Sequence, residues 1–216
     1  TRKGQALSHV AQCAPAMRYV HVGVNIGSIA QQGQSRDIIY LPEDGCLMKK
    51  VLTPDQFPKI RPATVNDAGH MHAMLKEIAR VTDSLEKFTS TKEDIVRDGF
   101  GDIPAFRALI GETDAGMPLA MCLYFDSYST FRGKAGIYIQ DLYVDSSLRG
   151  GGFARYLFAH VADYARKNNR HYIRLSVDAE NMTGQKFYRK IGMKGAVNEY
   201  IYVLEGNALT TLAAEA

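Results

Sequence analysis

The stretch of sequence that decides the fold lies at residues 144–154 and reads VDSSLRGGGFA. Before it, the run 137–144 is rich in β-branched and aromatic residues, which predicts a central strand. After it, an apolar stripe at helical spacing predicts an amphipathic helix with Phe153, Leu157, Val161 and Ala165. A glycine-rich bend between a strand and a helix leaves backbone N–H groups unpaired at the positive end of the helix dipole. The sequence therefore predicts a phosphate-binding anion site at this bend.

The bend lacks the signatures of two common phosphate-binding loops. A dinucleotide site needs Gly-x-Gly-x-x-Gly, but counting from Gly150 the last position is Arg155. A nucleoside triphosphate loop needs Gly-Lys-Ser/Thr, which is absent from the bend. The pattern that is present is Arg-x-x-Gly-x-Ala, from Arg149 to Ala154.

Around the bend, the pattern of apolar residues and chain breakers predicts a mixed sheet with helices on its faces. Strands are expected at residues 59–63, 106–111, 118–128, 137–144, 172–177 and 200–204. Helices are expected from 66–67 to 81, from a capping box of Ser90 and Glu93 to about 98, from 153 to about 169, and over 181–191. Several antiparallel strands followed by one β-α-β unit give an α/β fold of the α+β mixed-sheet kind.

Composition narrows the class of protein. Of the 216 residues, 46% are hydrophobic and 23% are charged, which is typical of a soluble globular chain. No run approaches the ~18 consecutive apolar residues of a membrane-spanning helix, so no membrane partner is expected. Three scattered cysteines, Cys13, Cys46 and Cys122, form no disulfide framework or Cys-x-x-Cys motif and favour a reducing compartment, the cytoplasm.

The charge is distributed unevenly. Residues 1–36 hold four basic side chains and no acidic one, whereas the rest of the chain holds 22 basic and 23 acidic side chains. A near-neutral body lacks the basic footprint that nucleic-acid binding requires, so no nucleic-acid partner is expected. The acid-free start has the charge of a targeting signal, but residues 20–26 alternate like a strand, which favours an ordered extension.

Proline and glycine residues crowd the stretch before Lys59, namely Pro42, Gly45, Pro54 and Pro58. They predict a boundary between an N-terminal extension at 1–57 and a main domain at 58–216. The role of the extension is open. Its strand at 20–26 is expected to add to a sheet edge across a homodimer or to cover the acceptor site.

Two motifs in order give a resemblance to a known family. The segment Arg149 to Ala154 resembles the acetyl-coenzyme A pyrophosphate loop of the GNAT N-acetyltransferases. Residues 181–188, NMTGQKFY, followed by Gly192, resemble the Asn-x-x-Ala-x-x-Phe-Tyr helix of the same family. The tract 128–144 is similar to the diamine acetyltransferase branch, the spermidine/spermine type. The resemblance covers roughly residues 58–205 and implies the GNAT fold.

The resemblance also implies a binding site for acetyl-CoA. The pyrophosphate would lie on Gly150, Gly151, Gly152, Phe153, Ala154 and Arg155, with Arg149 at the entrance of the loop. The pantetheine arm would pair with the backbone of Leu142, Tyr143 and Val144, as an added strand does. Asn181 would hydrogen-bond the pantetheine from the helix that also carries Gly184; the alternative for Asn181 is a helix N-cap, which is compatible with that role.

By the same resemblance, Tyr188 would protonate the departing thiolate. A phenol with an ordinary pKa of about 10 is protonated at neutral pH and can donate to a sulfur anion. The alternative is a core aromatic, as expected for the neighbouring Phe187. The branch usually has Glu-Asp on the central strand where this chain has Gln140 and Asp141. Because glutamine cannot titrate, deprotonation of the amine must rely on Asp141, on ordered water or on an acceptor of low pKa.

Taken together, these expectations describe acetyl transfer to the primary amine of a small molecule, by direct attack in a ternary complex. No metal is expected, because His70 and His72 are two residues apart on a helix and diverge around its axis. Two alternatives stay open: acetylation of a peptide or protein amine, and a non-catalytic acyl-CoA sensor.

Overall fold

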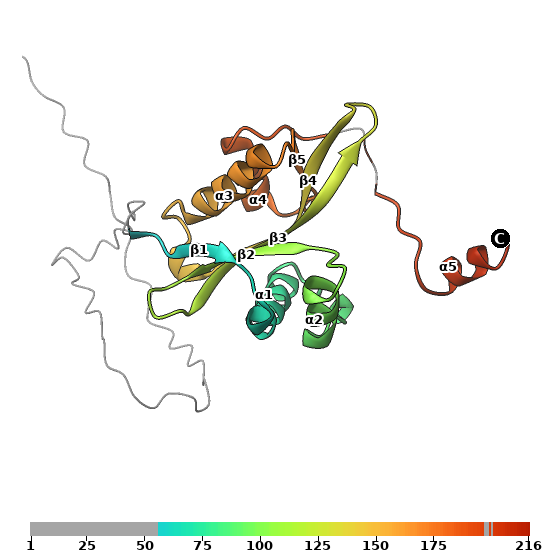
Figure 1. Cartoon of the computed structure of the whole chain (residues 1–216), viewed down its shortest axis with the longest axis horizontal. Helices are drawn as coiled ribbons and strands as arrows, with labels where there is room; N and C mark the ends of the chain where they lie inside the picture. The colour runs from blue at the N-terminus through green and yellow to red at the C-terminus, as the bar shows by residue number, and fades with distance from the viewer. Residues whose placement is uncertain (1–55, 197–198, 200) are drawn as a thin grey trace, which may run out of the picture. The chain divides into compact units, whose positions relative to one another are not determined.

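The computed structural model describes residues 56–196, 199 and 201–216. Figure 1 labels its elements. The strands are β1 Lys59–Pro62, β2 Arg107–Glu112, β3 Pro118–Ser129, β4 Lys134–Val144 and β5 Ile173–Leu175. The α-helices are α1 Ala68–Val81, α2 Lys92–Phe100, α3 Phe153–Lys167, α4 Met182–Lys190 and α5 Gly206–Ala213. Short 3-10 turns lie at Val65–Asp67, Leu85–Lys87 and Ser146–Leu148.

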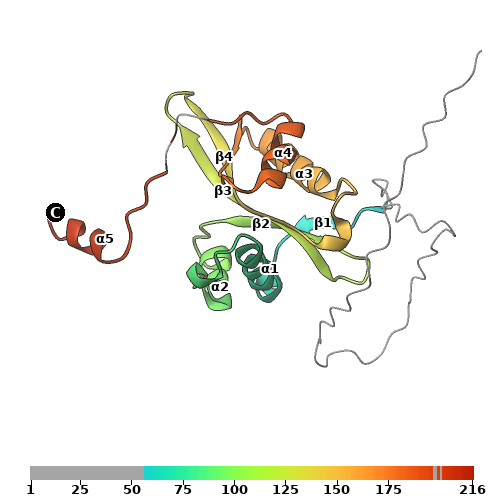
Figure 2. The ribbon, with the colours of Figure 1, turned by 180° about the vertical axis from the view of Figure 1, so that it is seen from behind.

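The five strands form one mixed sheet in the order β1-β2-β3-β4-β5. Each of the first three neighbouring pairs is antiparallel, and β4 pairs with β5 in parallel. Helix α3 is the crossover between the two parallel strands. Helices α1 and α2 cover one face of the sheet, and α3 and α4 cover the other (Figures 1 and 2). The predicted mixed sheet with helices on its faces is confirmed.

Alternation along β3 divides the core into two clusters, one on each face. Ala120, Cys122 and Tyr124 belong to the cluster beneath α3, whereas Met121 and Leu123 belong to the cluster beneath α1 and α2. Cys122 is fully buried and packs as a small core residue in the cluster beneath α3.

Several boundaries differ from the sequence expectation, among them those of α2 and β4. The capping box of α2 uses Thr91 and Asp94 in place of Ser90 and Glu93, because the helix begins one residue later, at Lys92. Strand β4 starts at Lys134, since the turn of its hairpin is confined to 130–133, where Gly133 has a φ of 57°. The longer β4 extends the ladder with β3 as far as the pair Ser129 and Lys134.

The expected strand at 200–204 is wrong for its described part. Residues 201–204 belong to no strand, and α5 follows them. Their apolar composition favours a strand, but a strand needs a paired edge, and none is paired with them among the described residues. The strand expected at 20–26, and all of the predicted extension before Gln56, lie outside the described residues.

The buried carboxylate of Asp67 links the first elements of the domain through hydrogen bonds. Asp67, at the entry to α1, accepts two hydrogen bonds from Arg61 of β1, at 2.7 and 2.8 Å, and one from the backbone N–H of Thr64 at 2.7 Å. Nε of Arg61 donates to Glu112 of β2 at 2.7 Å. These hydrogen bonds, those from Arg61 first, lower the pKa of Asp67 to about 2. The network therefore joins β1, α1 and β2.

We expect Asp67→Ala to lower the free energy of unfolding by about 2–4 kcal/mol at pH 7, because Arg61 and Thr64 lose a buried partner. A lowered carboxyl pKa adds stability above its usual value of 3.8 that is lost as the pH falls through about 2. Denaturant unfolding of both proteins at pH 7, 4 and 2 measures this, and the difference between them should shrink at pH 2. Asp98→Ala removes an exposed ion pair with Arg97 and serves as the control with an unchanged midpoint. An equal effect of the two substitutions would contradict this role.

Candidate active site

The bend between β4 and α3 is built to present backbone N–H groups. Asp145 accepts from the backbone N–H of Ser147 at 2.9 Å, and a 3-10 turn leads into the glycines. Gly150 and Gly152 have φ values of 83° and 94°, in the left-handed region that favours glycine. Within the described part of the chain, the six consecutive N–H groups of residues 150–155 donate to no acceptor.

Packing and one hydrogen bond hold this bend in place. Leu148 and Phe153 are buried on either side of the glycines and anchor both ends in the core beneath α3. Arg149 donates from Nε to the carbonyl oxygen of Val144 at 2.8 Å, which ties the bend to the last residue of β4. Ala154 is half-buried and Arg155 is exposed at the first turn of α3. The predicted loop residues are thus brought together at the start of one helix.

The edge of β4 next to the bend is open. Strand β5 pairs with residues 137–139 of β4, so residues 140–144 of β4 have no strand partner on that side among the described residues. Leu142 and Val144 pack in the cluster beneath α3, and Tyr143 packs in the cluster beneath α1 and α2. The backbone of these residues lies beside the bend and can accept an additional extended chain.

A β-bulge interrupts β4 at Gln140. Leu123 pairs with Asp141 and Tyr124 pairs with Ile139, which leaves Gln140 as the extra residue without a partner on β3. Gln140 is exposed. Strict alternation predicts that Gln140 and Asp141 point to opposite faces, and the bulge breaks that alternation at this pair of residues.

Asp141 is a largely buried carboxyl without a partner. It makes no hydrogen bond and no ion pair to any described residue, and burial raises its pKa to about 6. A carboxyl group with this pKa is ionised at neutral pH but accepts a proton far more readily than an ordinary aspartate. This is the property that a general base in a cleft requires.

Tyr188 on α4 lies close to the same place. Its ring packs in the cluster beneath α3 and lies edge-on to Phe187, at 5.2 Å between ring centroids. Burial first, and then the charges of Cys122 and Asp141, raise the pKa of its phenol to about 12. The hydroxyl has no hydrogen-bond partner among the described residues, so a protonated phenol is available to a ligand. The ring of Tyr188 can therefore pack in the core while its hydroxyl is available to a ligand.

Asn181 is the N-cap of α4. Its Oδ1 accepts from the backbone N–H of Gly184 at 2.8 Å, which confirms the capping interpretation. A Cβ at Gly184 would come within 2.9 Å of the Asn181 amide nitrogen, so a larger residue there would require the Asn181 side chain to shift. The side-chain nitrogen of Asn181 has no protein acceptor in the described structure and is free to donate to a ligand.

Sequence reasoning missed two features of the site. The bulge at Gln140 has no sequence signal of its own. The other is the proximity of Cys122 to Asp141 and Tyr188, which contributes to the raised pKa of Cys122 and of Tyr188. The alternation of β3 was the available signal, because it places Cys122 on the α3 face of the sheet.

Two other kinds of feature are absent from the described residues, a metal-binding cluster and a membrane-spanning helix. No group of three or more His, Cys, Asp or Glu side chains in them is arranged to hold a metal ion. His72 instead has its Nε2 within 2.9 Å of the carbonyl oxygen of Ser90. No helix in this part of the chain is both long enough and apolar enough to cross a bilayer.

Comparison with known proteins agrees with this geometry. Residues 72–193 match the acetyltransferase (GNAT) family. Thialysine N-epsilon-acetyltransferase of Bos taurus is 29% identical over 167 residues, covering 73% of this chain and 98% of that protein. The human spermidine/spermine N(1)-acetyltransferase-like protein 1 is 28% identical over 113 residues, or 50% of this chain and 16% of that protein. Both names agree with the predicted resemblance to the diamine branch.

A solved structure shares the fold. An integron cassette protein from the mobile metagenome of V. cholerae superimposes with a TM-score of 0.60 at 22% identity, over 72% of this chain and 96% of that one. The family match spans more than half of the chain and includes the bend, the bulged strand and α4. The chain therefore belongs to the GNAT family of acetyltransferases and is an N-acetyltransferase.

Proposed function

We propose that the protein transfers the acetyl group of acetyl-CoA to a primary amine of a small molecule, by direct attack within a ternary complex. The observation that carries the proposal is the row of six unpaired N–H groups at residues 150–155, next to an open strand edge. Free amides at a helix N-terminus suit a diphosphate, and an open strand edge suits the amide-containing pantetheine arm.

Each predicted binding residue has a role in this arrangement. The pyrophosphate is bound by the backbone amides of Gly150, Gly151, Gly152, Phe153, Ala154 and Arg155. Arg149 holds the loop in place through its hydrogen bond to the carbonyl oxygen of Val144. The backbone of Leu142, Tyr143 and Val144 pairs with the pantetheine. The free amide nitrogen of Asn181 donates to the same arm. Gly184 contributes through its backbone N–H, which donates to the side chain of Asn181 at the start of α4.

Acid catalysis falls to Tyr188. As the amine nitrogen forms its bond to the acetyl carbon, the C–S bond breaks and the sulfur takes up negative charge. The hydroxyl of Tyr188 donates its proton to that sulfur, which gives the free thiol. Its raised pKa keeps the phenol protonated at neutral pH before the reaction, and the phenolate regains its proton from solvent.

Base catalysis falls to Asp141. The attacking amine must be neutral and loses one proton when the amide forms. Asp141 accepts this proton, directly or through a water molecule, because its carboxylate is unpaired and has a raised pKa. Gln140 cannot titrate, but its exposed amide can hydrogen-bond the acceptor.

The acceptor is a small amine. The relatives are named for thialysine and for spermidine and spermine, which are small molecules with primary amines. Replacement of a second carboxylate by Gln140 favours an acceptor with a low amine pKa over a fully cationic polyamine. The free, buried thiol of Cys122 is compatible with a reducing, cytoplasmic setting.

We expect Gly152→Ala to weaken acetyl-CoA binding about tenfold, because an alanine resists the left-handed backbone that the bend requires, at a cost of roughly 1–2 kcal/mol. Calorimetric titration with acetyl-CoA measures the effect. Gly116→Ala is the matched control, since Gly116 has a φ of 78° in the β2–β3 hairpin and a Cβ there meets nothing within 4 Å. Equal affinities of the two variants for acetyl-CoA would show that the bend does not bind the coenzyme.

We expect Tyr188→Phe to reduce kcat about 100-fold with little change in the affinity for acetyl-CoA, because only the proton donor is lost. Release of free thiol with diamines, lysine analogues and amino acids as acceptors measures kcat. Tyr164→Phe is the control, since Tyr164 is also a half-buried tyrosine in the cluster beneath α3. Full activity of Tyr188→Phe would exclude the acid role. Activity of the wild-type protein on peptides alone would assign a peptide or protein acceptor. Binding of acetyl-CoA by the wild-type protein without any turnover would indicate a non-catalytic sensor.

We expect kcat/KM to rise as the pH increases through about 6, the pKa of Asp141, because the carboxyl group must be ionised to accept the proton. Asp141→Asn should abolish this dependence and be slow at every pH. It should not lower stability at pH 7, since burial of the ionised group costs the folded wild type free energy that asparagine avoids. Asp163→Asn, at a surface ion pair on α3, keeps the wild-type profile. A wild-type profile in Asp141→Asn would assign the base elsewhere.

A further inference from the structure

The chain that enters β1 packs against the start of α3. Phe57 lies just before β1 and is half-buried. Its ring lies edge-on to Phe153, with 5.5 Å between the ring centroids, and its centroid is 4.9 Å from that of Tyr156. The rings of Phe153 and Tyr156 are themselves 6.0 Å apart. Three aromatic rings from two distant parts of the sequence therefore form one cluster at the first turn of this helix.

Phe57 also contacts the bend itself. A Cβ at Gly152 would lie 3.7 Å from Cζ of Phe57, which is an ordinary van der Waals distance. Apart from the neighbouring residues of the chain, no other described atom lies within 4 Å of that position. Gly152 has a φ of 94°, and its N–H is one of the six that donate to no described acceptor. The ring of Phe57 thus packs on the left-handed glycine at the centre of the anion site.

Phe153, which begins α3, is also held by β2. A Cβ at Gly111 would lie 2.7 Å from Cζ of Phe153, so the ring occupies the space that a side chain at Gly111 would fill. Phe153 is fully buried, and its own N–H is without an acceptor in the described structure. The first residue of the helix is therefore packed against both β2 and Phe57.

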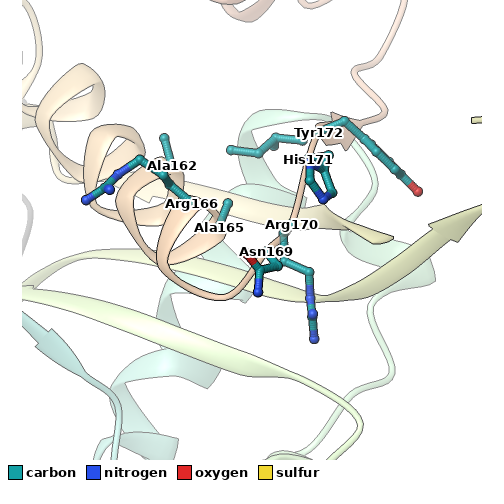
Figure 3. Close-up of a pocket in the computed structure, with 8 residues that line it drawn as sticks. Ala162, Ala165, Arg166, Asn169, Arg170, His171 and Tyr172 are labelled. Carbon is teal, nitrogen blue, oxygen red and sulfur yellow. The ribbon is translucent and has the colours of Figure 1, made fainter. Parts of the chain in front are cut away.

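The opposite end of α3 is packed less closely. A pocket of about 390 Å³ opens there between the helix and the chain that enters β5 (Figure 3). Ala162, Ala165 and Arg166 line it on the helix side, and His171 and Tyr172 line it on the other side. The helix is therefore held more tightly at the end that presents its free N–H groups than at the end that leads to β5.

We propose that Phe57 is a positioning residue for acetyl-CoA, which fixes the backbone of the bend in the conformation that binds the pyrophosphate. The inference rests on the proposed function, in which the amides of residues 150–155 bind that group. A preformed set of amides loses little conformational freedom when the ligand binds, and this raises the affinity. Without the ring, part of the binding free energy would be used to order the bend. The affinity for the coenzyme therefore depends on a residue that lies outside the strand, bend and helix that carry the motif.

Calorimetric titration of the full-length protein with acetyl-CoA tests this role. Phe57→Ala should raise the dissociation constant about fivefold, and Phe57→Leu, which keeps part of the apolar contact, should raise it less. At saturating acetyl-CoA, kcat and the KM for the amine should stay within about twofold of the wild-type values, because no reacting group is changed. Before coenzyme is added, the amide resonances of residues 150–155 should already be shifted or broadened in ¹⁵N-labelled Phe57→Ala.

Tyr164→Ala is the matched control. Tyr164 is also a half-buried aromatic residue that packs in the cluster beneath α3, and its ring lies 5.4 Å from that of Tyr124. Both substitutions should lower the free energy of unfolding, because each removes a ring from the same cluster. Tyr164→Ala should nevertheless keep the wild-type dissociation constant for acetyl-CoA. Wild-type affinity of Phe57→Ala, or equal weakening by the two substitutions, would overturn the proposal.

Gly152→Ala separates this inference from the function on which it rests. If Gly152→Ala weakens the binding of acetyl-CoA and Phe57→Ala does not, the bend binds the coenzyme and only the positioning role is wrong. If neither substitution weakens binding, the pyrophosphate is bound elsewhere, and the proposed site and the positioning role are both overturned. Weaker binding by both variants, with unchanged affinity in Tyr164→Ala, supports the role of Phe57.

Discussion

The free N–H groups at the β4–α3 bend are the constraint on which the rest of the site depends. Six amides in sequence have no acceptor within the described structure, and two left-handed glycines make this arrangement possible. Unpaired amides at the start of a fifteen-residue helix favour a negatively charged partner. The buried side chains of Leu148 and Phe153 fix the direction of the amides, because both are anchored in the core.

The remaining features supply a place for the chemistry beside this anion site. The pairing of β5 with β4 ends at Ile139, so that no described strand occupies the edge of β4 leading to the bend. The bulge at Gln140 interrupts the strand next to Asp141, whose charge contributes to the raised pKa of Tyr188. A ligand held at the bend and extended along β4 therefore reaches an available phenol and an unpaired carboxyl group.

Much of this could be predicted from the sequence, since the fold follows from local patterns. The run 137–144, the glycines and the stripe that starts at Phe153 define a strand, a bend and a helix whatever the distant contacts are. The bulge could not be predicted, because it depends on the register between β3 and β4. The state of residues 201–204 could not be predicted either: their composition favours a strand, but composition does not say which edge provides the partner.

The most direct test of the central claim is a titration of the ¹⁵N-labelled protein with coenzyme A, followed through its backbone amide resonances. The largest changes should fall on residues 150–155, and smaller changes should follow along residues 142–144. Binding of coenzyme A that leaves the amides of 150–155 unmoved would contradict it.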